Sequence, residues 1–363
     1  MVDLTARPQP WTAGQIDSDR SWIHNLSTEA VEDFDQALSH VRTLGKSIYE
    51  LTEDDFPLRS AGKAELLNAY ASTQRGWGLC LLKGFPVRRW SESDTRLAYW
   101  CMGLHVGTVR TQNTASEVIC DVRDSGNQNY QGKNGRGYNT NKSLDFHVDF
   151  CDVVSLLCRR TARAGGTSLI VSSRAVVADI EKRYPHLVPA LYEPLYYSLQ
   201  GAHAPGTSPY YACPLLGEKD GIRAFRTNRK NIIAAQRDFP EVPRLTDLQK
   251  ELIDVLDTFW TDSRFCFSMQ LDEGDMQLVN NYVVVHSRTD FEDFDDPDEK
   301  RHLLRLWMCL PQSQALPDSW RDAFTDTCAG ALRGGNRGSN ITPEFLAYER
   351  RQAERRGMPN VFS

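Results

Sequence analysis

Residues 143–150 read Ser-Leu-Asp-Phe-His-Val-Asp-Phe and place His147 two positions before Asp149. A second histidine, His286, follows Asp149 by 137 residues. Two imidazoles and one carboxylate form the facial triad that holds Fe(II) on one side and leaves the other side open for oxygen chemistry. Alone, a His-x-Asp pair is a weak signal, because a surface histidine beside a solvated aspartate gives the same pattern. The triad prediction therefore depends on the sequence around the three residues.

Both histidines are expected near strand ends. His147 lies shortly before the apolar run 153–158 (Val-Val-Ser-Leu-Leu-Cys), which is typical of a buried strand. His286 closes a β-branched run that follows Asn280 and Asn281. Because a rigid sheet can aim side chains from its strand ends at one point, the surrounding sequence favours convergence of the triad.

A later stretch, residues 301–308 (Arg-His-Leu-Leu-Arg-Leu-Trp-Met), predicts another strand, and this one carries two arginines. Side chains four apart in a strand share a face, so Arg301 and Arg305 are expected to point the same way and His302 the opposite way. Two cations on an apolar strand are costly unless an anion or a carboxylate meets them. The stretch therefore indicates a binding site for an acid group.

These pieces, with three others, occur in one order between residues 77 and 308. The others are Gly-Leu-His-Val-Gly at 103–107 with Gln112-Asn113, Ala-Gly-Gly-Thr-Ser at 164–168, and Gly274-Asp275. In this order they resemble the TauD/TfdA-like Fe(II)/2-oxoglutarate-dependent dioxygenases. The resemblance implies a mainly β fold, a distorted double-stranded β-helix (jelly roll) flanked by helices. Strand counting alone would not establish that fold.

The resemblance also implies residue roles. In that family the two histidines and the acid bind iron, which assigns His147, Asp149 and His286. The first arginine of the late pair binds the distal carboxylate of 2-oxoglutarate, which assigns Arg301. A hydroxyl residue after the Gly-Gly assists, which assigns Ser168, with Thr167 as the adjacent candidate. Because the acidic loop 291–300 resembles a small insertion, Arg305 remains an alternative to Arg301.

The implied cofactors are Fe(II), 2-oxoglutarate as cosubstrate, and O2. The implied reaction is hydroxylation, desaturation or cyclisation of a small substrate, with release of succinate and CO2. Asp149 argues for oxygenation, since related halogenases have a small residue at that position. Arg305 suggests a substrate that bears a carboxylate or similar acid; the alternative is that Arg305 pairs with a structural carboxylate such as Asp275.

Two long loops are candidates for the substrate side of the site. Residues 124–142 are rich in Gly and Asn and lead into the metal pair, so a substrate lid is expected there, against the alternative of a surface loop. Tyr138, Asn139 and Asn141 would then face the substrate. A second such loop covers residues 201–214.

The chain organisation is expected to be an arm at 1–20 and one domain at 21–363, with its core at about 77–310 and helical elaborations at both ends. Apolar spacing predicts helices at 28–45, 60–75 and 92–104 and a strand at 77–82. From 105 to 310 strands are expected to dominate, interrupted by one amphipathic helix at 246–262. Its expected apolar stripe is Leu248, Leu252, Ile253, Leu256 and Phe259.

Composition excludes several classes of protein. A net charge of −6 and a pI near 5.8 argue against a nucleic-acid binder. No segment has the ~20 apolar residues that span a bilayer, and residues 1–8 contain no apolar signal-peptide core. Nine cysteines without a Cys-x-x-Cys pair indicate reduced thiols and a cytoplasmic protein. The expected partner is a small-molecule substrate, and a homo-oligomer remains open.

Two other functions are compatible with the triad. A zinc-dependent, cupin-like enzyme would use the same ligands with an activated water. That enzyme would have no need of Arg301 or of the Gly-Gly-Thr-Ser element. A non-catalytic jelly roll that binds a small acid would have no need of three metal ligands.

Overall fold

The protein is described by a computed structural model, which covers residues 7–126 and 137–361. In this part of the chain a seven-stranded major sheet has the order β1-β2-β13-β5-β16-β3, with β4 pairing β16. Its strands are β1 Ile23–Asn25, β2 Leu79–Lys83, β13 Met276–Asn280, β5 Val153–Arg160, β16 His302–Cys309, β3 Thr108–Arg110 and β4 Cys120–Val122. All its pairs are antiparallel except β1 with β2.

A three-stranded minor sheet, in the order β12-β7-β14, faces the major sheet. Its strands are β12 Phe267–Met269, β7 Ser168–Ser172 and β14 Val284–Arg288. Val154 and Trp307 of the major sheet share one hydrophobic cluster with Ile170 and Val284 of the minor sheet. Two antiparallel sheets packed face to face in this way form the double-stranded β-helix, so the predicted fold class is confirmed.

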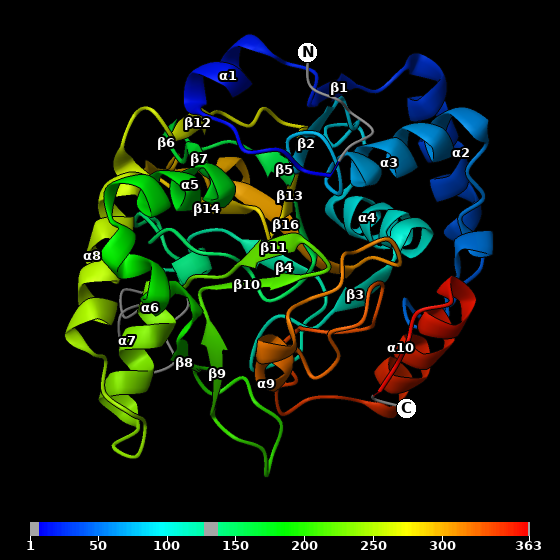
Figure 1. Ribbon diagram of the computed structural model, residues 1–363. Coiled ribbons are helices and arrows are strands. Elements are labelled where there is room, and N and C mark those ends of the chain that lie inside the picture. Colours follow the sequence, from blue (N-terminus) through cyan, green and yellow to red (C-terminus); the bar gives the residue numbers. More distant parts are fainter. Residues whose placement is uncertain (1–6, 127–136, 362–363) are drawn as a thin grey trace.

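Period-2 alternation in the central strands separates the two faces of the major sheet. In β16, Leu303 and Trp307 point between the sheets, whereas Leu304 and Leu306 belong to a second cluster on the other face. That second face is covered by the helices α2 Thr28–Val41, α3 Ser60–Ser72, α4 Glu92–Val106 and α10 Pro343–Arg356. Figure 1 shows these helices together on one side of the strands. The alternation sets which residues of β16 can reach an internal site.

Further elements enclose the minor sheet. Figure 1 shows α6, α7 and α8 on the side opposite α10. The remaining helices are α1 Ala13–Ser18, α5 Ser173–Arg183, α6 Val188–Tyr192, α7 Arg229–Asp238, α8 Asp247–Thr261 and α9 Arg321–Phe324. Short 3-10 turns are η1 Glu53–Asp55, η2 Gly137–Asn139, η3 Pro185–Leu187, η4 Pro297–Glu299 and η5 Asp318–Trp320. Two-stranded ribbons are β6 Ala164–Gly165 with β15 Phe291–Glu292, β8 Pro194–Ser198 with β9 Tyr210–Pro214, and β10 Leu216–Lys219 with β11 Ile222–Phe225.

The predicted helices at 28–45, 60–75 and 92–104 are confirmed as α2, α3 and α4, and the helix at 246–262 is α8. Leu248 is an exception to the predicted stripe of α8. It lies in the first turn and is 43% exposed, so the buried stripe begins one turn later, at Leu252.

Two expectations about the chain organisation differ from the structure. Residues 105–310 contain α5, α6 and α7 in addition to α8. Residues 7–20 pack on the domain instead of forming an arm, because Trp11 and Ile16 are buried and the Trp11 indole donates to the backbone carbonyl of Trp77 at 3.0 Å. None of the helices in the described residues has the length and apolar character that a membrane span requires.

Candidate active site

The three predicted triad residues lie side by side between the two sheets. His147 precedes β5 and His286 lies in β14, and each backbone N–H donates to the other's carbonyl, at 3.0 and 2.9 Å. Asp149 is held by its own N–H, which donates to the side chain of Asn281 at 2.9 Å. Backbone pairing therefore fixes where all three side chains begin.

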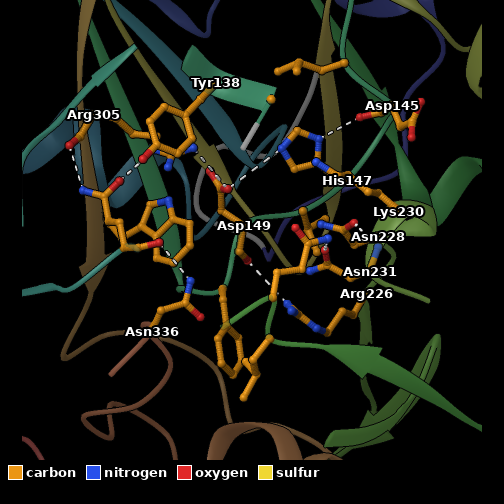
Figure 2. A pocket seen from close by; sticks show the side chains of 18 of the residues that line it. Tyr138, Asp145, His147, Asp149, Arg226, Asn228, Lys230, Asn231, Arg305 and Asn336 are labelled. Carbon is orange, nitrogen blue, oxygen red and sulfur yellow. Dashed lines mark hydrogen bonds and ion pairs between the residues drawn. The ribbon is translucent and has the colours of Figure 1, made fainter. Parts of the chain in front are cut away.

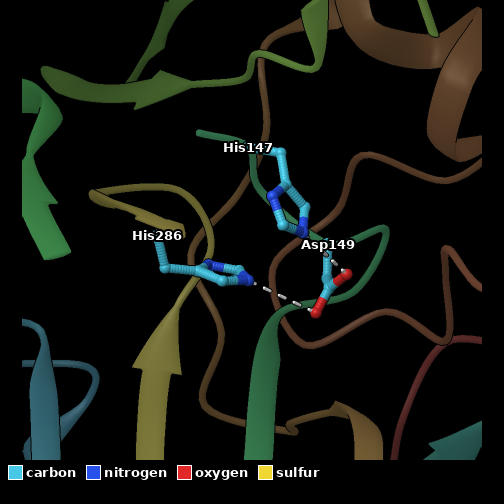
Figure 3. Close-up of side chains that lie close together, drawn as sticks. All are labelled: His147, Asp149 and His286. Carbon is cyan, nitrogen blue, oxygen red and sulfur yellow. Dashed lines mark ion pairs between the residues drawn. The ribbon is translucent and has the colours of Figure 1, made fainter. Parts of the chain in front are cut away.

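The side chains converge on one point (Figure 3). His286 Nε2 is 3.6 Å from Asp149 Oδ2, and His147 Nε2 is 3.9 Å from Asp149 Oδ1. One ligand atom from each residue lies within 4.8 Å of the others. His147 uses its Nδ1 on the backbone carbonyl of Asp145, at 2.8 Å, so its Nε2 faces the other two residues. This arrangement could hold one metal ion.

The donor set also fits an ion chemically. Asp149 Oδ2 is buried and has no hydrogen-bond partner in the described structure, which is costly for a carboxylate oxygen unless a donor or a metal ion meets it. Burial, and then the neighbouring His286, lowers the pKa of His147 to about 4. Burial alone would raise the pKa of Asp149, but the Arg305 guanidinium and then His286 hold that pKa well below its usual range. A neutral imidazole and an ionised carboxylate are the forms that bind metal.

A small cavity of about 50 Å³ adjoins the triad; we call it the inner cavity. Arg301 lines it and is 5% exposed, and its Nη1 atom is buried without a partner in the described residues. Burial lowers the pKa of Arg301 to about 10. A buried guanidinium with an unpaired nitrogen suits a carboxylate ligand.

The two hydroxyl residues predicted to assist cosubstrate binding, Ser168 and Thr167, lie in different places relative to the inner cavity. Ser168 lines the cavity, and its Oγ donates to Gln277 at 2.9 Å. Thr167 is absent from the lining, and its Oγ1 accepts a hydrogen bond from Gln270 at 2.6 Å. Of the two, Ser168 is therefore the residue in position to meet a ligand.

Arg305 lies between the inner cavity and a second one. It lines both, with its Nη1 3.6 Å from Asp149 Oδ1 and its Nε donating to Gln112 at 2.7 Å. The proposed alternative partner, Asp275, instead pairs with Lys83 at 2.6 Å, where β2 ends and β13 begins. The carboxylate beside Arg305 is therefore that of the triad.

The second cavity has a volume of about 140 Å³ and opens from the triad toward α7; we call it the outer cavity (Figure 2). His147 and Asp149 line it, and its other charged lining residues in the described chain are Asp145, Arg226, Lys230 and Arg305. Its other lining residues include Gln112, Tyr138, Phe150, Gln200, Tyr211, Asn228, Asn231, Trp307 and Asn336.

Of the three residues predicted to face the substrate, only Tyr138 lines the outer cavity. Its ring lies 4.8 Å from the Arg305 guanidinium carbon. Asn139 and Asn141 instead fasten the segment through their backbone carbonyls, which accept from Ser125 and Phe291, each at 3.0 Å. Most of the expected lid, residues 127–136, lies outside the described residues.

Several lining residues were not predicted. Asn336 comes from the C-terminal part of the chain and donates to the backbone carbonyl of Gln112 at 2.9 Å. Arg226 lies against the Phe150 ring, with its guanidinium carbon 4.6 Å from the ring centroid, and donates to the Tyr211 hydroxyl. Neither belongs to a recognisable motif. Each lies in a polar stretch, at 226–231 and 333–338, whose sequence does not show where the stretch lies in the fold.

Comparisons with known proteins agree with this geometry. The sequence profile of the family described as "Taurine catabolism dioxygenase TauD, TfdA family" matches residues 26–307. The chain is similar to FR-33289 synthase of Streptomyces rubellomurinus, with 28% identity over 330 residues, 88% of this chain and 95% of that protein. It is also similar to the taurine hydroxylase-like protein SAT17 of Stachybotrys chartarum, with 24% identity over 82% of this chain and 77% of that protein.

Solved structures share the fold at low sequence identity. Asparagine oxygenase in complex with Fe(II), a hydroxyasparagine and succinate superposes with a TM-score of 0.60 at 16% identity, covering 79% of this chain and 93% of that one. The non-heme iron oxygenase OrfP, in complex with iron and alpha-ketoglutaric acid, gives a TM-score of 0.57 at 16% identity over the same shares.

Proposed function

The chain belongs to the TauD/TfdA family of dioxygenases, and from this membership we propose that it is an Fe(II)- and 2-oxoglutarate-dependent oxygenase. It oxidises a small organic substrate with O2 and releases succinate and CO2. The observation that carries the proposal is the convergence of two imidazoles and one carboxylate beside a buried arginine with an unpaired nitrogen.

The proposed metal ligands are His147, Asp149 and His286. With iron and 2-oxoglutarate bound, the site supplies O2 activation, in which the oxo acid is decarboxylated and oxidised while an oxygen atom becomes available to the substrate. Burial keeps His147 in its neutral, metal-binding form by lowering its pKa, and Arg305 keeps Asp149 ionised by lowering the pKa of that carboxyl. Asp149 retains a carboxylate at the position that is a small residue in related halogenases, which supports oxygenation.

The inner cavity is proposed as the cosubstrate site. Arg301 would bind the distal carboxylate of 2-oxoglutarate through two parallel hydrogen bonds, and the Ser168 hydroxyl, rotated away from Gln277, would donate a further one. Both residues line the cavity that adjoins His286 and Asp149. Zinc chemistry with an activated water gives no reason for a buried cation there.

The outer cavity is proposed as the substrate site, and the substrate is proposed to be a small acid. Among the described residues, Arg226, Lys230 and Arg305 line it against a single carboxylate outside the triad, Asp145. That balance favours an anionic group. Asparagine oxygenase and OrfP have been solved with hydroxylated amino acids, which are also small acids. Hydroxylation is the proposed outcome, and desaturation or cyclisation would follow from the same site.

The proposed location is the cytoplasm. All nine cysteines are free, and seven of them are buried. Unpaired thiols in such number are typical of a reducing compartment.

Anaerobic titration of the metal-free protein with Fe(II) and then 2-oxoglutarate tests the function. A weak visible charge-transfer band of the iron chelate is expected for the native protein and is expected to vanish in His286→Ala, which removes one ligand. His186→Ala is the matched control, because this exposed histidine pairs with Glu251 on the surface. The control should keep the full band.

Two results would contradict the proposal. Bound Fe(II) without any response to 2-oxoglutarate, together with zinc in the purified protein, would favour the zinc enzyme. A band without O2 consumption or succinate release across a panel of small acids would favour an acid-binding protein that does no chemistry.

A further inference from the structure

Arg288 lines the inner cavity with Arg301 and Arg305, and it is the one of these three buried cations that the proposed reaction does not yet use. It follows His286 by two residues in β14, so both side chains point to the same face, about 6.7 Å apart along the strand. It lines the same cavity as Arg301, and each side chain is 5% exposed. The face of β14 that carries a proposed metal ligand therefore also carries a guanidinium.

The contacts of Arg288 leave part of its guanidinium unused. Its Nη2 donates to the backbone carbonyls of Thr140, at 3.1 Å, and Lys142. Its Nε donates to the carbonyl of Thr289 at 3.1 Å. Its Nη1 is buried and has no partner among the described residues. A purely structural anchor would satisfy all three guanidinium nitrogens with protein acceptors. In Arg288 the Nη1 atom has none among the described residues, so this nitrogen remains for a ligand.

Arg288 and Arg301 both have a buried guanidinium nitrogen without a partner among the described residues. Their guanidinium carbons lie 4.8 and 4.9 Å from the centroid of the same ring, Phe291. In the described chain no carboxylate forms an ion pair with either side chain, and each has an unpartnered Nη1. Two buried cations without a counter-ion in one cavity are costly, and a bound anion relieves the cost.

We propose that Arg288 is a second cationic residue for the distal carboxylate of the cosubstrate, and that its other nitrogens couple the filled cavity to residues 140–142. This inference rests on the proposed function. It makes Arg288 a determinant of cosubstrate choice, because a 2-oxo acid without a second carboxylate gains nothing from it. It also connects the cosubstrate to the segment between Tyr138 and His147.

Binding of two oxo acids tests the first part. Calorimetric titrations would use the protein loaded with Mn(II), which supports no turnover. The ligands are 2-oxoglutarate and 2-oxobutanoate, which is the same oxo acid without its distal carboxylate. The variants are Arg288→Gln and Arg288→Lys. The matched control is Arg163→Gln, since Arg163 is exposed and pairs with Glu292 on the neighbouring strand.

Loss of a hydrogen bond between charged groups should weaken 2-oxoglutarate binding to Arg288→Gln by roughly 10- to 100-fold. Binding of 2-oxobutanoate should change less than twofold, and Arg288→Lys should be intermediate for 2-oxoglutarate. The control should match the native protein for both acids. Because a general distortion would weaken both acids together, the ratio of the two affinities reports on the carboxylate contact.

Other outcomes overturn the inference in distinguishable ways. Unchanged 2-oxoglutarate affinity in Arg288→Gln, or an equal loss for both acids, would make Arg288 a structural anchor and leave the proposed function intact. No binding of 2-oxoglutarate to the native protein would contradict the proposed function itself. If circular dichroism shows that Arg288→Gln is unfolded, the affinity ratio in Arg288→Lys decides.

Hydrogen exchange tests the coupling. In the native Mn(II) protein, 2-oxoglutarate should slow amide exchange in residues 140–146, and in Arg288→Gln at saturating 2-oxoglutarate this slowing should be absent. Equal slowing in both proteins would show that the segment responds to the metal site without Arg288.

Discussion

Arg305 illustrates how one buried side chain can serve two cavities. Its guanidinium touches the Asp149 carboxylate, the Gln112 amide and the rings of Tyr138 and Trp307. All these contacts lie where the inner and outer cavities meet. Its charge therefore acts both on a proposed metal ligand and on any acid in the outer cavity.

Replacing Arg305 should separate these two effects. In Arg305→Gln the KM of the acid substrate found by succinate release should rise roughly 10- to 100-fold, because a charged hydrogen bond is lost. Uncoupled turnover of 2-oxoglutarate should change only several-fold. Steady-state kinetics measure both, and Arg96→Gln, a partly exposed arginine paired with Asp121, is the control. Equal damage to both reactions would mean that Arg305 serves the metal ligand or the fold.

At the residue scale, the positions of the triad residues could be predicted from the sequence better than those of the loop residues around them. His147, Asp149 and His286 could be placed because a metal restricts residue type and because strand signals flank them. Arg301 and Arg305 could be placed because period-2 geometry relates them, and both do line the inner cavity. Asn139 and Asn141 could not be placed. A loop without periodicity does not show whether a residue contributes its side chain to a cavity or its backbone carbonyl to a hydrogen bond.

At the element scale, the turn between β6 and β7 positions Arg301. Gly166 has φ +70°, and a Cβ atom there would lie 2.9 Å from Arg301 Nε. Both the left-handed backbone and the close approach require glycine. The second glycine of the Gly-Gly pair is thus explained by the Arg301 side chain that packs over it, and the first, Gly165, by the backbone of Asp290, whose carbonyl oxygen would clash with a Cβ atom there.

Gly166→Ala should therefore displace Arg301. We expect the KM for 2-oxoglutarate to rise at least tenfold, with a loss of stability of about 1–3 kcal/mol from the strained backbone. Gly206→Ala is a matched control, since Gly206 has φ +80° but no atom within 4 Å of its Cβ position. Gly206→Ala should lower the stability and leave the KM for 2-oxoglutarate unchanged. An unchanged KM in Gly166→Ala would mean that Arg301 adapts or does not bind the cosubstrate.

The elements themselves were unequally predictable. Helix α8 could be predicted because its apolar spacing is regular and Thr246 caps it, accepting from the Gln249 backbone at 3.2 Å. Helix α7 was missed because it is short and polar, and only Ile232, Ala234 and Ala235 are buried. Its position is set by tertiary packing, which a local pattern does not contain.

At the scale of the whole molecule, the C-terminal segment returns to the site. Arg333 is fully buried, and its Nε donates to Asp152 at 2.9 Å. The Gly335 N–H donates to the Phe150 carbonyl at 2.7 Å, and Asn336 lines the outer cavity. Residues 311–363 carry no periodic pattern that points to the triad, so this return to the site could not be predicted from the sequence.

Arg333→Met should destabilise the fold by about 3–5 kcal/mol, because it leaves the buried Asp152 carboxylate without its cation. Urea denaturation followed by tryptophan fluorescence measures the change. Arg321→Met is the control, since Arg321 is exposed and 3.9 Å from Asp318, and it should change stability by less than ~0.5 kcal/mol. Asp152 also accepts hydrogen bonds from the Tyr282 hydroxyl at 2.6 Å and the Leu310 backbone N–H at 2.9 Å. A similar small change in Arg333→Met would show that these two hydrogen bonds suffice to stabilise the buried carboxylate.

The backbone pairing of His147 with His286 joins positions 139 residues apart in the chain. Such a pair does not exist in the unfolded polypeptide, so an ion would find its ligands only in the finished fold. Metal binding then stabilises the folded state of the entire protein relative to the unfolded chain. An ion at a hundred times its dissociation constant would add about 2.7 kcal/mol to the free energy of unfolding. Iron starvation would therefore shorten the lifetime of this protein as well as remove its activity.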